Sequence, residues 1–153
     1  MARMTNAIAL AALAGVMSFS QAQAAAAPAF EDKDVIEYRE RIMKTLQEQT
    51  STIGMVVSTQ IPPDNIVAHA EAIALAAKMA AKSFDQKVLG GEAKPDVWTK
   101  YPDFQKRMAV FVEKSQAMAD AAKKGASISE ITEMLVDALP CKDCHDLYRD
   151  EKK

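Results

Sequence analysis

The sequence predicts an all-α protein folded as an antiparallel four-helix bundle. Apolar residues recur every three or four positions along four stretches of the chain, which is the spacing of one helical face. Clusters of proline or glycine separate these stretches, and no run alternates apolar and polar residues as a strand would. Four amphipathic helices of about 20 residues, joined by mostly short connections, pack most simply as such a bundle.

The first two helices are expected over residues 32–58 and 66–84. Pro62 and Pro63 separate them, because proline has no backbone N–H to donate within a helix. Asp64 or Asn65 can cap the second helix. The expected inward faces are Ile36, Met43, Leu46, Thr50, Ile53 and Val57 in the first helix, and Ile66, Ala70, Ile73, Ala77, Ala80 and Phe84 in the second.

A longer connection, residues 85–101, precedes the third helix, which we expect to begin at Pro102 and to end at Lys124 and Gly125. A short turn over residues 96–98 is expected within that connection. The expected inward face of the third helix is Phe104, Met108, Phe111, Ser115, Met118 and Ala122.

The fourth helix begins with Ser127 and Glu130, which form the pattern of a capping box. Pro140 lies inside this helix and removes the bond to the Val136 carbonyl, so we expect a kink or a restart there. The expected inward face is Ile131, Met134, Ala138, Cys141, His145 and Tyr148.

Residues 1–24 have the pattern of a secretory signal peptide. Arg3 precedes an apolar run over residues 7–19, and this run is shorter than the roughly 20 residues that span a bilayer. Ala22-Gln23-Ala24 supplies a cleavage site with small residues. We expect cleavage before Ala25, export from the cytoplasm and a single domain over residues 25–153, with a retained membrane anchor as the alternative.

The charge of the chain gives no sign of nucleic-acid binding. The full sequence has 19 Lys and Arg against 21 Asp and Glu, for a formal net charge of −2. Removal of the signal peptide takes away one arginine and no acid, which leaves the domain slightly more negative. No net-basic surface is expected that would neutralise phosphates.

Cys141-Lys142-Asp143-Cys144-His145 is the attachment motif of a c-type haem. On a helix, residues three apart share a face, so both thiols can form thioether bonds to one porphyrin. His145 then supplies an imidazole nitrogen to the iron. The motif predicts one covalent haem c, bound through Cys141 and Cys144 and ligated by His145.

Two other interpretations of the cysteines are weaker. A structural zinc site usually has four Cys or His ligands, and the chain has two cysteines and two histidines, so His69 would have to complete it. A thioredoxin-like cysteine pair would lie in a βαβ unit, for which the sequence shows no pattern. His69 falls beside the inward face of its helix, so we expect it to be exposed or half-exposed.

The chain resembles the cytochrome c prime family, the class II c-type cytochromes. The resemblance is carried by Asp34-Val35-Ile36-Glu37-Tyr38-Arg39, by Lys94-Pro95-Asp96-Val97-Trp98 and by the terminal Cys-Lys-x-Cys-His-Asp-x-Tyr-Arg over residues 141–149. It covers essentially all of residues 25–153. It implies a four-helix bundle in a bacterial periplasm, with a pentacoordinate or hexacoordinate haem among its helices.

The resemblance implies a role for Met43 and supports one for Arg39, and the four-residue spacing from His145 indicates one for Arg149. Counted from Tyr38-Arg39, the family's distal position falls on Met43, where low-spin electron-transfer members have methionine and high-spin members have a non-ligating residue. Arg39 is expected near a haem propionate, with extension to solvent as the alternative. Arg149 is expected beside His145, with a charge–dipole role at the helix end as the alternative.

From these residues we expect a periplasmic electron-transfer cytochrome, not an enzyme, whose iron is ligated by His145 and Met43. The alternative is a five-coordinate, high-spin protein that binds nitric oxide or carbon monoxide, and a metal-free or zinc-stabilised helical module is the third possibility. The expected partners are redox proteins that the sequence does not identify. We expect a monomer or a homodimer, with no stable membrane insertion after cleavage.

Overall fold

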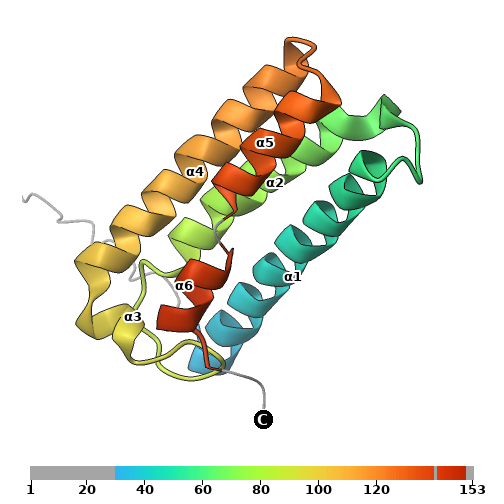
Figure 1. The fold of residues 1–153 in the computed structure, drawn as a ribbon. Coiled ribbons are helices and arrows are strands. Elements are labelled where there is room, and N and C mark those ends of the chain that lie inside the picture. The colour runs from blue at the N-terminus through green and yellow to red at the C-terminus, as the bar shows by residue number, and fades with distance from the viewer. Residues whose placement is uncertain (1–29, 140, 151–153) are drawn as a thin grey trace, which may run out of the picture.

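The structure is a computed structural model that describes residues 30–139 and 141–150. Its elements are α1 (Asp32–Val57), η1 (Pro63–Asn65), α2 (Ile66–Ser83), α3 (Asp96–Thr99), α4 (Tyr101–Lys123), α5 (Ile128–Ala138) and α6 (Cys141–Tyr148). α1, α2 and α4 are the three long helices, and α5 with α6 forms the fourth member of the bundle (Figure 1). The predicted all-α four-helix bundle is confirmed.

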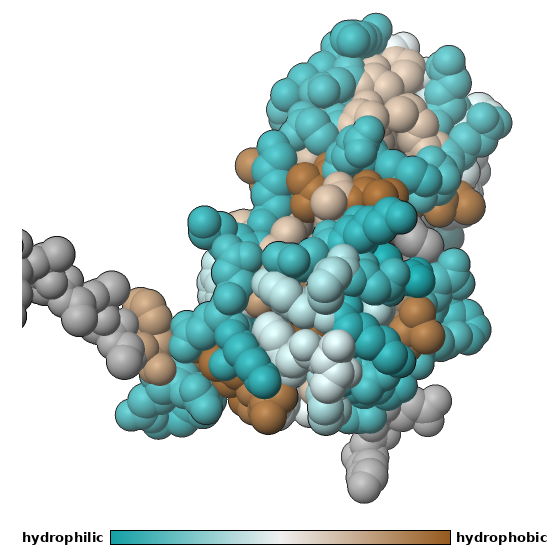
Figure 2. Space-filling model, turned by 90° about the vertical axis from the view of Figure 1, so that its left-hand side faces the viewer, coloured by the Kyte–Doolittle hydropathy of each residue, from teal (hydrophilic) through white to brown (hydrophobic). Residues whose placement is uncertain are grey.

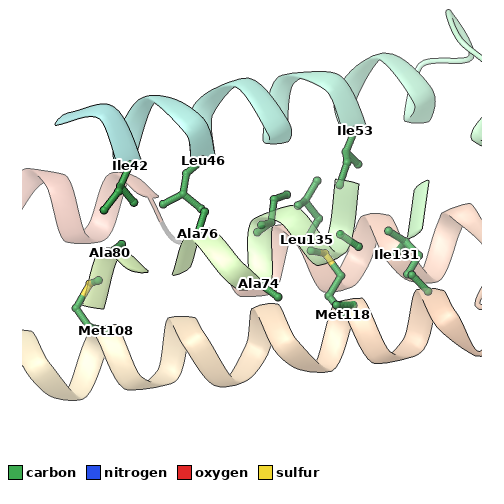
Figure 3. Close-up of a cluster of buried hydrophobic side chains, with 14 of the residues drawn as sticks. Ile42, Leu46, Ile53, Ala74, Ala76, Ala80, Met108, Met118, Ile131 and Leu135 are labelled. Atoms are coloured by element: carbon green, nitrogen blue, oxygen red, sulfur yellow. The ribbon is translucent and has the colours of Figure 1, made fainter. Parts of the chain in front are cut away.

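The small side chains of α2 allow the neighbouring helices to pack close to it. α2 packs against α1 and α4, and α5 packs along α4 while touching α1 only narrowly. The six inward residues predicted for α2 are all buried, together with Ala74 and Ala76. Figure 3 shows Ile42, Leu46 and Ile53 pointing from α1 into the interior that Met108 and Met118 enter from α4. The core is therefore tightest where the alanines of α2 separate α1 from α4.

The inward face of α1 differs from the prediction. Leu46 and Ile53 are buried as expected, but the remaining predicted residues are half-buried: Ile36, Met43, Thr50 and Val57. The buried face instead contains Arg39, Ile42 and Val56. The buried face therefore begins with a charged residue, Arg39, which a pattern of apolar residues does not include.

The turn from α4 to α5 follows the predicted chemistry. Gly125 has φ +83°, a left-handed conformation that glycine adopts without strain. The Glu130 N–H donates to Ser127 Oγ at 3.3 Å, and the Ser127 N–H donates to Glu130 Oε2 at 2.8 Å. These reciprocal bonds confirm the capping box.

The fourth helix is broken where Pro140 predicts a restart. α5 ends at Ala138 and α6 begins at Cys141, while Pro140 itself lies outside the described residues. α6 is eight residues long, which is too short to be stable alone. Its position on the bundle must therefore come from tertiary contacts.

Tyr148 supplies the contact that fixes α6 to α4. The side chain is buried, and its hydroxyl donates to Asp103 Oδ2 at 2.6 Å. The Tyr148 ring packs edge-to-face on Phe104 with 5.2 Å between ring centroids. This hydrogen bond, followed by that from Arg107, lowers the pKa of Asp103 from its ordinary value of 3.8.

The face of the molecule drawn in Figure 2 is largely hydrophilic, and its apolar side chains form separate patches. Within the described part of the chain, no helix combines the length and the apolar character needed to cross a membrane.

Tyr148→Phe should lower the midpoint of thermal unfolding of the haem-loaded protein by a few degrees at neutral pH, because it removes the hydroxyl and keeps the ring. The lowered pKa of Asp103 means that the stabilisation is present above pH 3.8 and is lost as pH falls through the lowered pKa. The difference in unfolding midpoint between the variant and wild type should therefore become smaller at acidic pH. Tyr38→Phe, at an exposed position of α1, is the matched control. Equal midpoints at neutral pH would contradict the assigned role of Tyr148.

Candidate haem site

The first five residues of α6 place the cofactor-binding side chains together. Cys141 is exposed, Cys144 and His145 are half-buried, and both cysteines are free thiols. Residues three and four positions apart lie on the same side of a helix. Two thioether bonds and one iron ligand can therefore come from a single face of α6, as the motif predicts.

The surroundings of His145 favour a neutral imidazole, mainly through burial. Burial lowers the pKa of His145, and the positive charge of Arg149 lowers it further. The neutral ring is the form that binds a metal ion. Burial raises the pKa of the Cys144 thiol, an effect that the charge of Arg107 opposes. His145 is therefore neutral at pH 7 and available as a ligand.

Arg149 follows His145 by one helical turn and is held by a residue that sequence reasoning missed. Arg149 Nε donates to Glu92 Oε2 at 2.6 Å, and the Arg149 N–H donates to the His145 carbonyl at 2.9 Å. Arg149 thus lies beside His145, the predicted iron ligand. The only feature of the sequence near Glu92 is the preceding glycine pair, which predicts a turn and not a partner for Arg149.

Arg39 is buried, so the alternative in which it extends to solvent is wrong. Its guanidinium lies 4.6 Å from the centroid of the Phe84 ring and 5.2 Å from that of the Trp98 ring. Burial lowers the pKa of Arg39, but an arginine remains charged. It donates to three backbone carbonyls at and after the end of α2: Ser83 at 2.9 Å, Gln86 at 2.7 Å and Val88 at 2.9 Å.

Met43 lies one turn after Arg39 on α1 and is half-buried at the side of the core. Ile42 and Leu46, which flank it, are buried and apolar. The structure thus places Met43 at the edge of the inward face and not at its centre. Its side chain is one of the partly buried apolar residues that pack against the core, as are Met134 on α5 and Leu139 after it.

These residues fit a haem, which has an apolar ring and two carboxylates. Among residues 30–139 and 141–150, two buried polar side-chain atoms have no hydrogen-bond partner, and one of them is Nε1 of Trp98. A buried indole N–H normally has an acceptor. The neighbouring Arg39 guanidinium makes this a favourable place for a carboxylate. Partly buried apolar side chains, among them Leu139 two residues before α6, suit the apolar ring.

His69 is not brought to the cysteines. Its Nδ1 lies 2.8 Å from Gln49 Oε1, in a hydrogen bond between α2 and α1, and the side chain is half-buried as predicted. In the described ranges, no three His, Cys, Asp or Glu side chains are grouped so that they could hold a metal ion. The arrangement does not support the zinc interpretation of Cys141 and Cys144.

Family models and curated relatives both match this chain to one family. Residues 34–149 match the family model described as Cytochrome C'. Cytochrome c prime from Alcaligenes xylosoxydans xylosoxydans is 25% identical over 123 residues, which cover 78% of this chain and 96% of that protein. The protein of the same name from Pararhodospirillum photometricum is 28% identical over 119 residues, covering 75% of this chain and 95% of the relative.

Solved structures have the same fold. Cytochrome c prime from Shewanella frigidimarina aligns with a TM-score of 0.73 at 26% identity, covering 81% of this chain and 100% of that one. A nitric-oxide-bound ferrous variant from Alcaligenes xylosoxidans aligns with a TM-score of 0.74 at 23% identity, covering 82% and 100%. With its C-terminal haem motif and its bundle, this chain belongs to the cytochrome c prime family, whose members carry one covalent c-type haem.

Proposed function

We propose that the chain is a periplasmic haem protein that binds nitric oxide or carbon monoxide on the side of a five-coordinate iron opposite His145. The observation that carries this proposal is a haem motif on α6 that contains one of the chain's two histidines, His145. His145 is half-buried on α6, whereas His69, the only other histidine, is bonded to Gln49. The iron then has one imidazole and no second nitrogen ligand from a histidine.

The relatives support this choice over the electron-transfer interpretation predicted from Met43. Cytochrome c prime variants from Alcaligenes xylosoxidans have been solved with nitric oxide and with carbon monoxide bound. Those complexes describe that protein, and we extend gas binding to this chain as part of the proposal. The low-spin, methionine-ligated subtype has no comparable support among the relatives.

The residues of the chain have separate tasks in this proposal. Cys141 and Cys144 tether the cofactor, and His145 binds the iron from α6. Ile42 and Leu46 present hydrocarbon on α1 and limit the access of water. A ferrous haem supplies the metal that binds the gas. In this proposal the chain binds its ligand reversibly and performs no turnover.

Electron transfer with Met43 as the second ligand is the second candidate. Met43 is half-buried, lies one turn from Arg39 and packs against the core. A thioether is a soft ligand that favours ferrous iron. As an electron carrier, the protein would have other redox proteins as its partners. For either candidate we propose export to the periplasm after cleavage before Ala25, as a monomer or a homodimer.

Covalent attachment should be visible in the mass of the protein. When the chain is produced in a host with cytochrome maturation, denaturing mass spectrometry should show the mature polypeptide plus one haem. A Cys141→Ser, Cys144→Ser double variant should lose the added mass, whereas each single variant keeps one thioether position. An unmodified wild-type mass from such a host would contradict the haem assignment.

Met43→Leu separates the two candidates. Our proposal predicts that the wild-type protein is high-spin in its ferric form at neutral pH and that its ferrous form binds carbon monoxide readily. Met43→Leu should change the spin state and the gas binding little. A Met43-ligated protein would instead be low-spin and become high-spin in the variant. The substitution nearly conserves side-chain volume and should lower the free energy of unfolding by less than about 1.5 kcal/mol. Met118→Leu in the buried core is the packing control. A low-spin wild type that Met43→Leu converts would refute the five-coordinate site.

A further inference from the structure

A segment between α2 and α3 is paired with the end of the chain beside the iron ligand. The Lys94 N–H donates to the Tyr148 carbonyl at 3.0 Å, and the Asp150 N–H donates to the Glu92 carbonyl at 2.8 Å. Ala93 and Arg149 form an antiparallel bridge between them. The backbone on both sides of Arg149 is thereby fixed, so the position of its guanidinium depends on the side chain alone.

The same segment is anchored to α1 and to α6. Gly91 has φ +62°, and a Cβ at this position would lie 2.6 Å from Ile36 Cγ2, so glycine allows a close approach to α1. Lys94 Nζ donates to the Asp146 carbonyl at 2.9 Å. Glu92 therefore extends from a turn that is held on two sides.

The ion pair between Glu92 and Arg149 is short and partly shielded. Nε and Oε2 are 2.6 Å apart, and the side chains are 25% and 43% exposed for Glu92 and Arg149. Ion pairs near the surface contribute little to stability. The location of this pair is more informative than its strength, because it restrains a cation one helical turn from His145.

We propose that Glu92 is a positioning residue of the haem site, whose carboxylate holds the Arg149 guanidinium beside His145 and thereby sets the electrostatic field at the axial ligand. This inference rests on the proposed ligation of iron by His145. A cation beside the ligand favours the ferrous state, since ferric iron carries one more positive charge. The restraint by Glu92 determines how strongly Arg149 acts on the iron.

A double-mutant cycle on the haem-loaded protein tests this role. The midpoint potential is measured for wild type, Glu92→Gln, Arg149→Gln and the double variant. Arg149→Gln should lower the potential in the wild-type background. In the Glu92→Gln background the same change should have an effect smaller by roughly half or more, because the guanidinium is no longer held in place.

Asp146→Asn is the matched control for a simple loss of charge. Asp146 is adjacent to His145 but pairs with Lys142, at 2.5 Å, and not with Arg149. Its effect on the potential should add to that of Arg149→Gln. If Glu92→Gln yields no haem-loaded protein, Glu92→Asp provides the comparison, because it keeps the charge and shortens the reach.

The outcomes distinguish the two proposals. Additive effects of Glu92→Gln and Arg149→Gln in a haem-loaded protein would overturn the positioning role alone. The positioning role would also be overturned if Asp146→Asn changed the effect of Arg149→Gln on the midpoint potential as strongly as Glu92→Gln does. A wild-type protein without haem would overturn both this inference and the proposed function.

Discussion

The contact of Tyr148 with α4 is the interaction on which the haem site depends. α6 carries both cysteines and the proposed iron ligand, yet it is short and separated from α5. Tyr148 is the buried residue of α6, and it combines a hydrogen bond to Asp103 with ring packing on Phe104. Since a helix of this length has little stability of its own, these contacts hold α6 on the bundle, together with the hydrogen bonds that it and the residues after it make with Glu92 and Lys94.

The distribution of small and large side chains explains where a flat cofactor can lie. The alanines of α2 bring α1 and α4 close to it, whereas α5 touches α1 only narrowly. The half-buried Met43 on α1 and Leu139 before α6 pack against the core from its edge. Arg39 and Trp98 add polar donors near the end of α2. The bundle is thus closely packed around α2 and has half-buried apolar side chains at its edge, against which we propose that the haem lies.

Local patterns predicted most of the fold, because they depend on neighbours in sequence. The buried face of α2, the capping box at Ser127 and the restart after Pro140 all follow from helical periodicity or from the chemistry of a few adjacent residues. The face of α1 was predicted wrongly because Arg39 is buried against carbonyls more than 40 residues away. Glu92 was missed for the same reason, since its partner Arg149 is distant in sequence.

The central claim is that His145 is the axial ligand of the iron, and the two histidines of the chain allow a direct test. Pulsed electron paramagnetic resonance of the ferric, haem-loaded protein should show a strongly coupled nitrogen whose signature changes when histidine is labelled with ¹⁵N. The same change should persist in His69→Gln, in which His145 is the only remaining histidine. A nitrogen signature unaffected by the label, or a labelled signal lost in His69→Gln, would contradict the account.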